Sequence, residues 1–128
     1  MNGSTVKKAS PVGRAAAGMA GEQATLHRYL GLGYRAVARN WRCPLGEIDL
    51  VVARGGLLVF CEVKTRHGST FGGGFDAVGH RKQRKLRQLA EVFLLTRGLD
   101  PARARFDVAS VQLRQGDEPL VEIFEDAF

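Results

Sequence analysis

Two short apolar runs, residues 46–53 and 57–64, constrain the fold more than any other part of the sequence. Both are rich in Val, Leu, Ile and Phe, which favour strands, and the Gly-Gly pair between them is typical of a two-residue hairpin turn. We therefore expect an antiparallel hairpin. Pairing of Arg54 with Leu57 fixes its register, because each later pair lies one residue further along both strands.

That register gathers charged side chains on one face of the hairpin. Asp49 falls opposite Glu62, and Glu47 falls opposite Lys64, because side chains alternate between the faces of a strand. Directly opposed carboxylates have Cβ atoms about 5 Å apart and repel each other. A divalent cation with oxygen ligands, Mg²⁺ or Mn²⁺, would offset the repulsion. The alternative is a solvated strand end at which these acids pair with Lys64 or a nearby arginine.

The other face of the hairpin is apolar. We expect Ile48, Leu50 and Val52 to share this face and to pack with Val59 and Cys61 in a core. The charged face also becomes apolar toward the turn. The acids are therefore predicted at one end of a sheet that is covered on both sides.

The remaining periodicities predict an α/β fold. Apolar residues at helical spacing predict helices over 18–30 and 78–97, and alternating patterns predict strands over 34–41, 105–113 and 119–124. A helical connection between the third and fourth strands implies parallel pairing through a right-handed crossover. The expected result is a mixed sheet of four to five strands flanked by helices, in the order α-β-β-β-α-β(-β).

The length of 128 residues suits one domain. We expect a disordered basic tail over 1–15, a single folded domain over 16–128, and a glycine-rich loop over 66–76. No apolar run reaches the roughly 20 residues of a membrane helix. The two cysteines form no metal-binding or redox pattern, so we expect a cytoplasmic protein that does not contact membranes.

The net charge of +6 is unevenly placed along the chain. Residues 1–46 carry +6 and residues 76–99 carry +4, whereas residues 100–128 carry −4. Such a field attracts polyanions, and DNA is the partner that we expect. Our candidates for nucleic-acid contact are Arg66, Arg81, Lys82, Arg84 and Lys85. We favour phosphate contact for the two lysines at the start of the second helix, and the alternative is an ordinary solvated helix face.

Two further residues bear on the carboxylate pair. Glu22 shares a helix face with Leu26 and Leu30, so its side chain is predicted to point inward, although a first-turn acid is also favoured by the helix dipole. Lys64 follows Glu62 by two residues on the same strand face. Its ammonium would meet a phosphate oxygen or orient a water molecule, and the alternative is a surface ion pair with Glu47.

These residues carry a family resemblance. Asp49, followed after twelve residues by Glu62-Val63-Lys64, resembles the D…(D/E)-x-K signature of the restriction-endonuclease-like superfamily. The expected α-β-β-β-α-β order is similar to the common core of that superfamily, so the resemblance implies a restriction-endonuclease-like core. The segments "GEIDLVV", "VFCEVKTR", "FGGGFDAV" and "RFDVASV", in that order, resemble the YraN family over about residues 18–113. Holliday-junction resolvases share the layout with an upstream helical Glu, and the resemblance gives that role to Glu22.

The resemblance implies a metal-dependent endonuclease that hydrolyses DNA, with branched DNA among its substrates. Asp49 and Glu62 would bind Mg²⁺ or Mn²⁺, Glu22 would add a ligand directly or through water, and Lys64 would stabilise the developing phosphorane. Junction cutting would require a homodimer. Two alternatives stay open. One is a module on the same fold that binds nucleic acid or protein without turnover, and the other is a hydrolase of small phosphate esters, which the basic segments do not favour.

Overall fold

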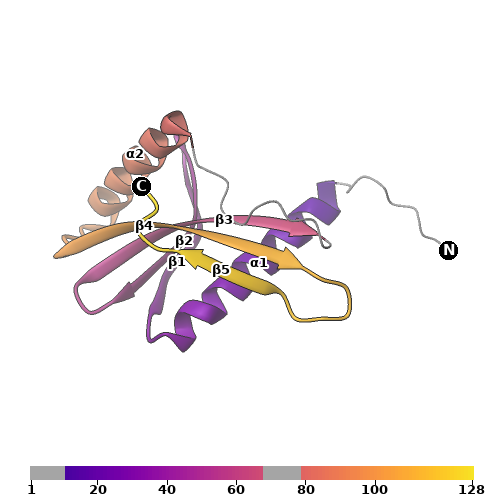
Figure 1. The fold of residues 1–128 in the computed structure, drawn as a ribbon. Coiled ribbons are helices and arrows are strands. Elements are labelled where there is room, and N and C mark those ends of the chain that lie inside the picture. Colours follow the sequence, from indigo (N-terminus) through magenta and orange to yellow (C-terminus); the bar gives the residue numbers. More distant parts are fainter. Residues whose placement is uncertain (1–10, 68–78) are drawn as a thin grey trace.

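The computed structural model describes residues 11–67 and 79–128, which form a five-stranded sheet with a helix on each face (Figure 1). The elements are α1 (Pro11–Gly31), β1 (Arg35–Cys43), β2 (Gly46–Arg54), β3 (Leu57–His67), α2 (His80–Arg97), β4 (Arg103–Leu113) and β5 (Leu120–Phe124). This is the predicted element order, with the final short strand present. The α/β prediction with a mixed sheet is confirmed.

The largest difference in element boundaries concerns the first helix. α1 begins at Pro11 rather than at residue 18, so residues 11–15, which the sequence pattern assigns to a tail, are helical. Proline suits the first position of a helix, and the alanines that follow have the highest helix propensity. Residues 1–10 of the predicted tail and residues 68–76 of the predicted glycine-rich loop lie outside the described residues.

The strands lie in the order β1-β2-β3-β4-β5, so neighbours in the chain are neighbours in the sheet. β3 and β4 are parallel and are connected by α2, and the other pairs are antiparallel. The hairpin of β2 and β3 pairs Arg54 with Leu57 and continues to Leu50 opposite Cys61. The predicted register is therefore confirmed over the half of the hairpin next to the turn.

Each face of the sheet is covered by one helix. α2 packs its buried face, centred on Phe93, against Phe60 and its neighbours. α1 packs Leu26 on the other face, against Leu50 and Val59. Within the described residues neither helix is long and apolar enough to cross a membrane. The sheet is therefore the middle layer of a three-layer sandwich.

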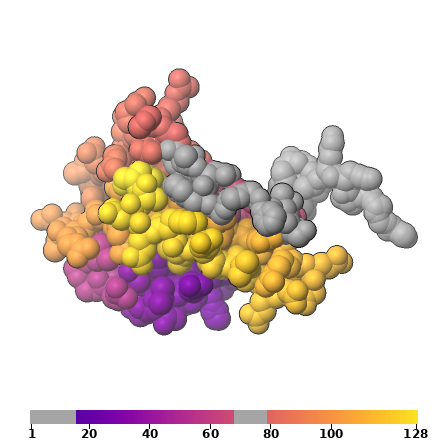
Figure 2. Space-filling view, viewed as in Figure 1, coloured from indigo at the N-terminus to yellow at the C-terminus, as the bar shows by residue number. Residues whose placement is uncertain are grey.

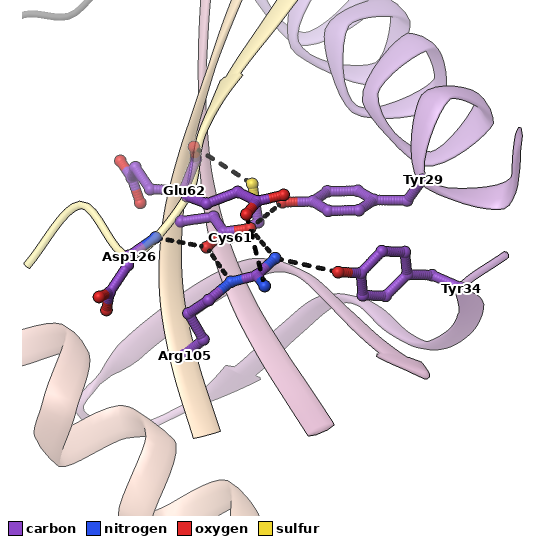
Figure 3. A network of polar contacts seen from close by, with 8 residues as sticks. Tyr29, Tyr34, Cys61, Glu62, Arg105 and Asp126 are labelled. Carbon is purple, nitrogen blue, oxygen red and sulfur yellow. Dashed lines mark hydrogen bonds and ion pairs between the residues drawn. The ribbon is translucent and has the colours of Figure 1, made fainter. Parts of the chain in front are cut away.

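A buried polar network ties α1 to the sheet (Figure 3). Asp107 on β4 is fully buried, and its carboxylate accepts hydrogen bonds from Tyr29 Oη of α1 at 2.7 Å and from the backbone N–H of Asp126 at 3.0 Å. Arg105 donates to both carboxylate oxygens, at 2.8 and 2.9 Å, and to Tyr34 Oη at 3.1 Å. A buried charge that is paired and fully hydrogen-bonded holds its neighbours in one arrangement. The network therefore fixes α1 on its face of the sheet.

The C-terminal residues pack beside α2. Phe128 stacks on Phe106 with ring centroids 5.3 Å apart, and the guanidinium of Arg87 on α2 lies over both rings. In the space-filling view the yellow C-terminal residues lie against the salmon surface of α2 (Figure 2). These contacts extend the core on the α2 side to the end of the chain.

Candidate metal centre

Asp49 lies on β2 at the point where the hairpin loses its backbone pairing. The β2–β3 pairs end at Leu50 and Cys61, and the next polar contact is made by a side chain. Asp49 Oδ2 accepts the backbone N–H of Val63 at 2.8 Å. The carboxylate thus takes the place of a strand carbonyl. The backbone pairing of the hairpin thus ends one position before the predicted pair of Asp49 with Glu62.

Pairing with the other neighbour, β1, is interrupted at the same level. The β1–β2 pairs flank Asn40 and Asp49 without including them, and Asn40 has a left-handed backbone with φ of 50°. The strand changes phase here, because Ile48 packs in the α2-facing cluster with Val51 and not with Leu50. The prediction that Ile48 and Leu50 share one core face is therefore wrong. Strict alternation holds only for a regular strand, and this strand is irregular at Asp49.

Glu47 lies close to Glu22 of α1. It precedes Ile48 on β2, at the end of the hairpin where the backbone pairing with β3 has stopped. Glu22 of α1, Glu47 and Asp49 each offer a carboxylate oxygen, and these atoms lie within 4.8 Å of one another. Hard divalent cations are bound by such convergent oxygen ligands. We call Glu22, Glu47 and Asp49 the acidic group.

The close approach of α1 to the sheet depends on Gly21, the residue before Glu22. A Cβ atom at Gly21 would clash with the side chain of Thr65 on β3. The same helical turn is closed by Thr25, whose fully buried Oγ1 donates to the carbonyl of Gly21 at 2.8 Å. The glycine lets helix and strand touch, and this contact brings the Glu22 carboxylate within reach of β2.

The acidic group is electrostatically strained. Burial, and next the charge of Glu62, raise the pKa of Asp49 to about 7, although the hydrogen bond from Val63 acts in the opposite direction. Burial also raises the pKa of Glu22, and a hydrogen bond from the Asn40 side chain lowers it. Buried like charges disfavour full ionisation, and a bound divalent cation reverses that balance. The acidic group therefore has the electrostatics of a cation site.

Glu62 lies beside the acidic group but is held from the α2 side. Its Oε2 lies 2.7 Å from Nζ of Lys82, and its side chain is 12% exposed. This ion pair borders a cleft of about 260 Å³ between β2, β3 and α2. The cleft is lined by Gly46, Glu47, Asp49, Glu62, Lys82, Lys85, Leu86 and Leu89. Acids and lysines thus share one concave surface.

The other predicted residues lie around this cleft. Lys64 is half-buried two residues beyond Glu62 on β3, and it does not belong to the cleft lining among the described residues. Arg66 is half-buried near the end of the same strand. Arg81 and Arg84 are exposed in the first turns of α2. Of the predicted cations, Lys82 and Lys85 are the two that line the cleft.

Sequence reasoning missed two residues of this site. It placed Glu47 opposite Lys64 and gave it no ligand role, whereas Glu47 Oε1 lies 3.4 Å from Nε of Arg42 and joins the acidic group. It also gave no role to Asn40, which hydrogen-bonds to Glu22. Asparagine is one of the few residues that adopt a left-handed backbone readily, and that was the available signal.

Comparison with known proteins places the chain in a family. A family model described as "Uncharacterised protein family UPF0102" matches residues 21–111. The chain belongs to the UPF0102 family. A UPF0102 protein of Moorella thermoacetica is 46% identical over 112 residues, which cover 87% of this chain and 93% of the relative. This membership confirms the YraN resemblance of the four sequence segments.

Other relatives match over a similar span. A UPF0102 protein of Rhodococcus jostii is 42% identical over 113 residues, 88% of this chain and 96% of the relative. One from Symbiobacterium thermophilum is 43% identical over 111 residues, 87% of this chain and 94% of the relative. The segment matched by the UPF0102 model spans the whole acidic group and the Lys82–Glu62 ion pair.

Proposed function

We propose that this UPF0102 protein is a metal-dependent endonuclease that hydrolyses phosphodiester bonds in DNA. The observation that carries the proposal is the convergence of three carboxylate oxygens, from Glu22, Glu47 and Asp49, within 4.8 Å of one another. Oxygen ligands of this kind favour Mg²⁺ or Mn²⁺. A bound ion would polarise a phosphate oxygen and lower the pKa of an attacking water molecule.

The surroundings of the acidic group support a phosphate substrate. Lys82 and Lys85 line the cleft next to the acids, and the first turn of α2 contains no acidic residue. Helix N-termini and lysine side chains both attract phosphate oxygens. A backbone phosphate in the cleft would therefore have the acidic group on one side and these cations on the other.

The residues take separate roles in this proposal. Asp49, fixed by its hydrogen bond from Val63, is the central ligand, and Glu22 and Glu47 complete the acidic group. Glu62 would supply a further carboxylate to the ion, and Lys82, which now contacts Glu62 at 2.7 Å, would contact a phosphate. Lys64, on the same strand face as Glu62, stabilises the charge that develops on the phosphorane.

One observation favours the rival function, a module that binds nucleic acid without cutting it. Lys82 neutralises Glu62 at 2.7 Å and keeps it out of the acidic group. A site in which Glu62 stays paired with Lys82 would bind DNA through its cations and would not cleave it. Cleavage assays separate the two functions.

The test uses single-stranded, duplex, flapped and four-way DNA with Mg²⁺ or Mn²⁺. Asp49→Asn removes the central ligand charge, and Asp117→Asn makes the same chemical change at an exposed acid outside the site. We expect the wild type and Asp117→Asn to cut at least one substrate and Asp49→Asn to cut none. Equal cutting by Asp49→Asn would remove this residue from catalysis and leave the binding module as the better description.

Binding to DNA is measured separately through its dependence on salt. Each neutralised duplex phosphate adds about 0.9 to the slope of log affinity against log salt concentration. Lys82→Gln with Lys85→Gln should flatten the slope by about one to two. The charge-matched control, Arg103→Gln with Arg114→Gln, changes two exposed cations away from the cleft and should leave the slope unchanged. An unchanged slope in the lysine variant would place the DNA elsewhere.

A further inference from the structure

Asn40 occupies an unusual position beside the acidic group. It lies on β1 with φ of 50°, one of two described non-glycine residues with positive φ. The β1–β2 pairs on either side are Arg39 with Leu50 and Trp41 with Ile48, so Asn40 lies level with Asp49 across the sheet. A left-handed residue inside a strand costs free energy and persists where the surrounding structure requires it.

The side chain of Asn40 contacts the part of the acidic group that comes from α1. It hydrogen-bonds to Glu22, a residue that is 9% exposed. An ionised carboxylate only accepts hydrogen bonds, so the amide NH₂ of Asn40 is the donor. A donor on β1 therefore holds the carboxylate that α1 contributes to the acidic group.

The backbone of Asn40 affects the other two acids. Trp41 packs in the α2-facing cluster, as Ala38 does, although regular alternation would place them on opposite faces. The phase of β1 thus changes across Asn40, in parallel with the change on β2 at Asp49. Asn40 is therefore connected to Glu22 through its side chain and to the irregular part of β2 beside Asp49 through its backbone.

We propose that Asn40 is a positioning residue, which shapes the acidic group for a divalent cation through its left-handed backbone and its side-chain amide. The inference rests on the proposed function, because it concerns the same cation. Groups that orient metal ligands from outside the ligand set typically contribute about 10–100-fold to metal affinity. The backbone and the amide are separable by substitution, since glycine adopts positive φ without strain and alanine does not.

The experiment is a titration of the metal-free full chain with Mn²⁺ alone, with free Mn²⁺ followed by electron paramagnetic resonance. Asn40→Gly keeps the backbone conformation and removes the amide, so we expect an unchanged fold and about tenfold weaker Mn²⁺ binding. Asn40→Ala removes both features and should bind at least as weakly with a lower melting temperature. Asp126→Gly, at the other described non-glycine residue with positive φ, is the control and should bind like the wild type.

The outcomes separate the two proposals. If the wild type binds one Mn²⁺ and Asn40→Gly binds it equally well, the positioning role is refuted and the metal site stands. If the wild type binds no Mn²⁺, the proposed function fails and the role of Asn40 fails with it. Weaker binding by both Asn40 variants, with the Asp126 control unaffected, supports the inference.

Discussion

Replacing Asp49 with Asn should stabilise the metal-free protein, and the gain should grow with pH. Burial and the charge of Glu62 raise the pKa of Asp49 from its ordinary value of 3.8 to about 7 in the folded state. The folded protein therefore binds this proton more tightly than the unfolded chain does. Stability contributed by the protonated group is complete below pH 3.8 and is lost as the pH rises to about 7.

The size of the effect follows from that difference. At about 1.36 kcal/mol for each pKa unit, ionised Asp49 costs the folded state up to roughly 4 kcal/mol at pH 8. Asn carries no charge, and its side-chain oxygen can still accept the N–H of Val63. We therefore expect Asp49→Asn to match the wild type near pH 4 and to exceed it by roughly 2–4 kcal/mol at pH 8.

The assay is urea unfolding in EDTA at several pH values, followed by circular dichroism. The difference between the two proteins isolates residue 49, because all other titrating groups are shared. For Asp117→Asn, which changes an exposed acid, the difference in unfolding free energy from the wild type should not vary with pH. If the free energies of unfolding of Asp49→Asn and the wild type differed by the same amount at every pH from 4 to 8, the view that this carboxylate is buried among like charges would be refuted.

Two further substitutions test the packing that places the site. Gly21→Ala should destabilise the fold by about 1–3 kcal/mol in urea unfolding, because the added Cβ clashes with Thr65. The control Gly18→Ala, which has open space at its Cβ, should be neutral or stabilising. Equal effects of the two substitutions on stability would contradict the close helix–strand contact. Arg105→Ala should lower the free energy of unfolding by about 3–5 kcal/mol, because it leaves buried Asp107 without its counter-ion. The control Arg103→Ala, at an exposed position, should lower it by at most about 0.5 kcal/mol. A small loss of stability in Arg105→Ala would mean that Asp107 is not held as a buried charge.

Regular parts of the fold could be predicted because local chemistry determines them. The Gly-Gly turn fixes the pairing of β2 with β3, and the helical segment before residue 98 implies parallel pairing of β3 with β4. The C-terminus of α2 was also readable, since Gly98 takes the left-handed conformation that commonly ends a helix. The turn and the helix end depend on residues close together in the sequence, and the parallel pairing follows from the general rule for helical crossover connections.

The irregular part of the site could not be predicted in the same way. Strict alternation put Glu47 and Asp49 on one face with Glu62, and the three residues do line one cleft. The approach of Glu47 to Glu22, beside the left-handed Asn40, was not predicted, because a local irregularity of a strand changes which side chains meet. Sequence patterns record the average period of a strand and not its exceptions.

Long-range polar partners were also invisible in the sequence. Asp107 lies in an alternating strand pattern, and nothing nearby indicates that it meets Tyr29 on the first helix. The contact between Lys82 and Glu62 joins a helix and a strand that periodicity treats separately. Such pairs depend on the three-dimensional arrangement of elements.

The metal site is tested most directly by a crystal soaked in Mn²⁺ and measured at a wavelength where manganese scatters anomalously. We expect one strong anomalous peak roughly 2.0–2.3 Å from carboxylate oxygens of Glu22, Glu47 and Asp49, as divalent cation–oxygen distances require. The peak should be absent in Asp49→Asn crystals soaked in the same way. Manganese bound only at exposed acids, with no peak among these three carboxylates, would contradict the assignment of a metal centre.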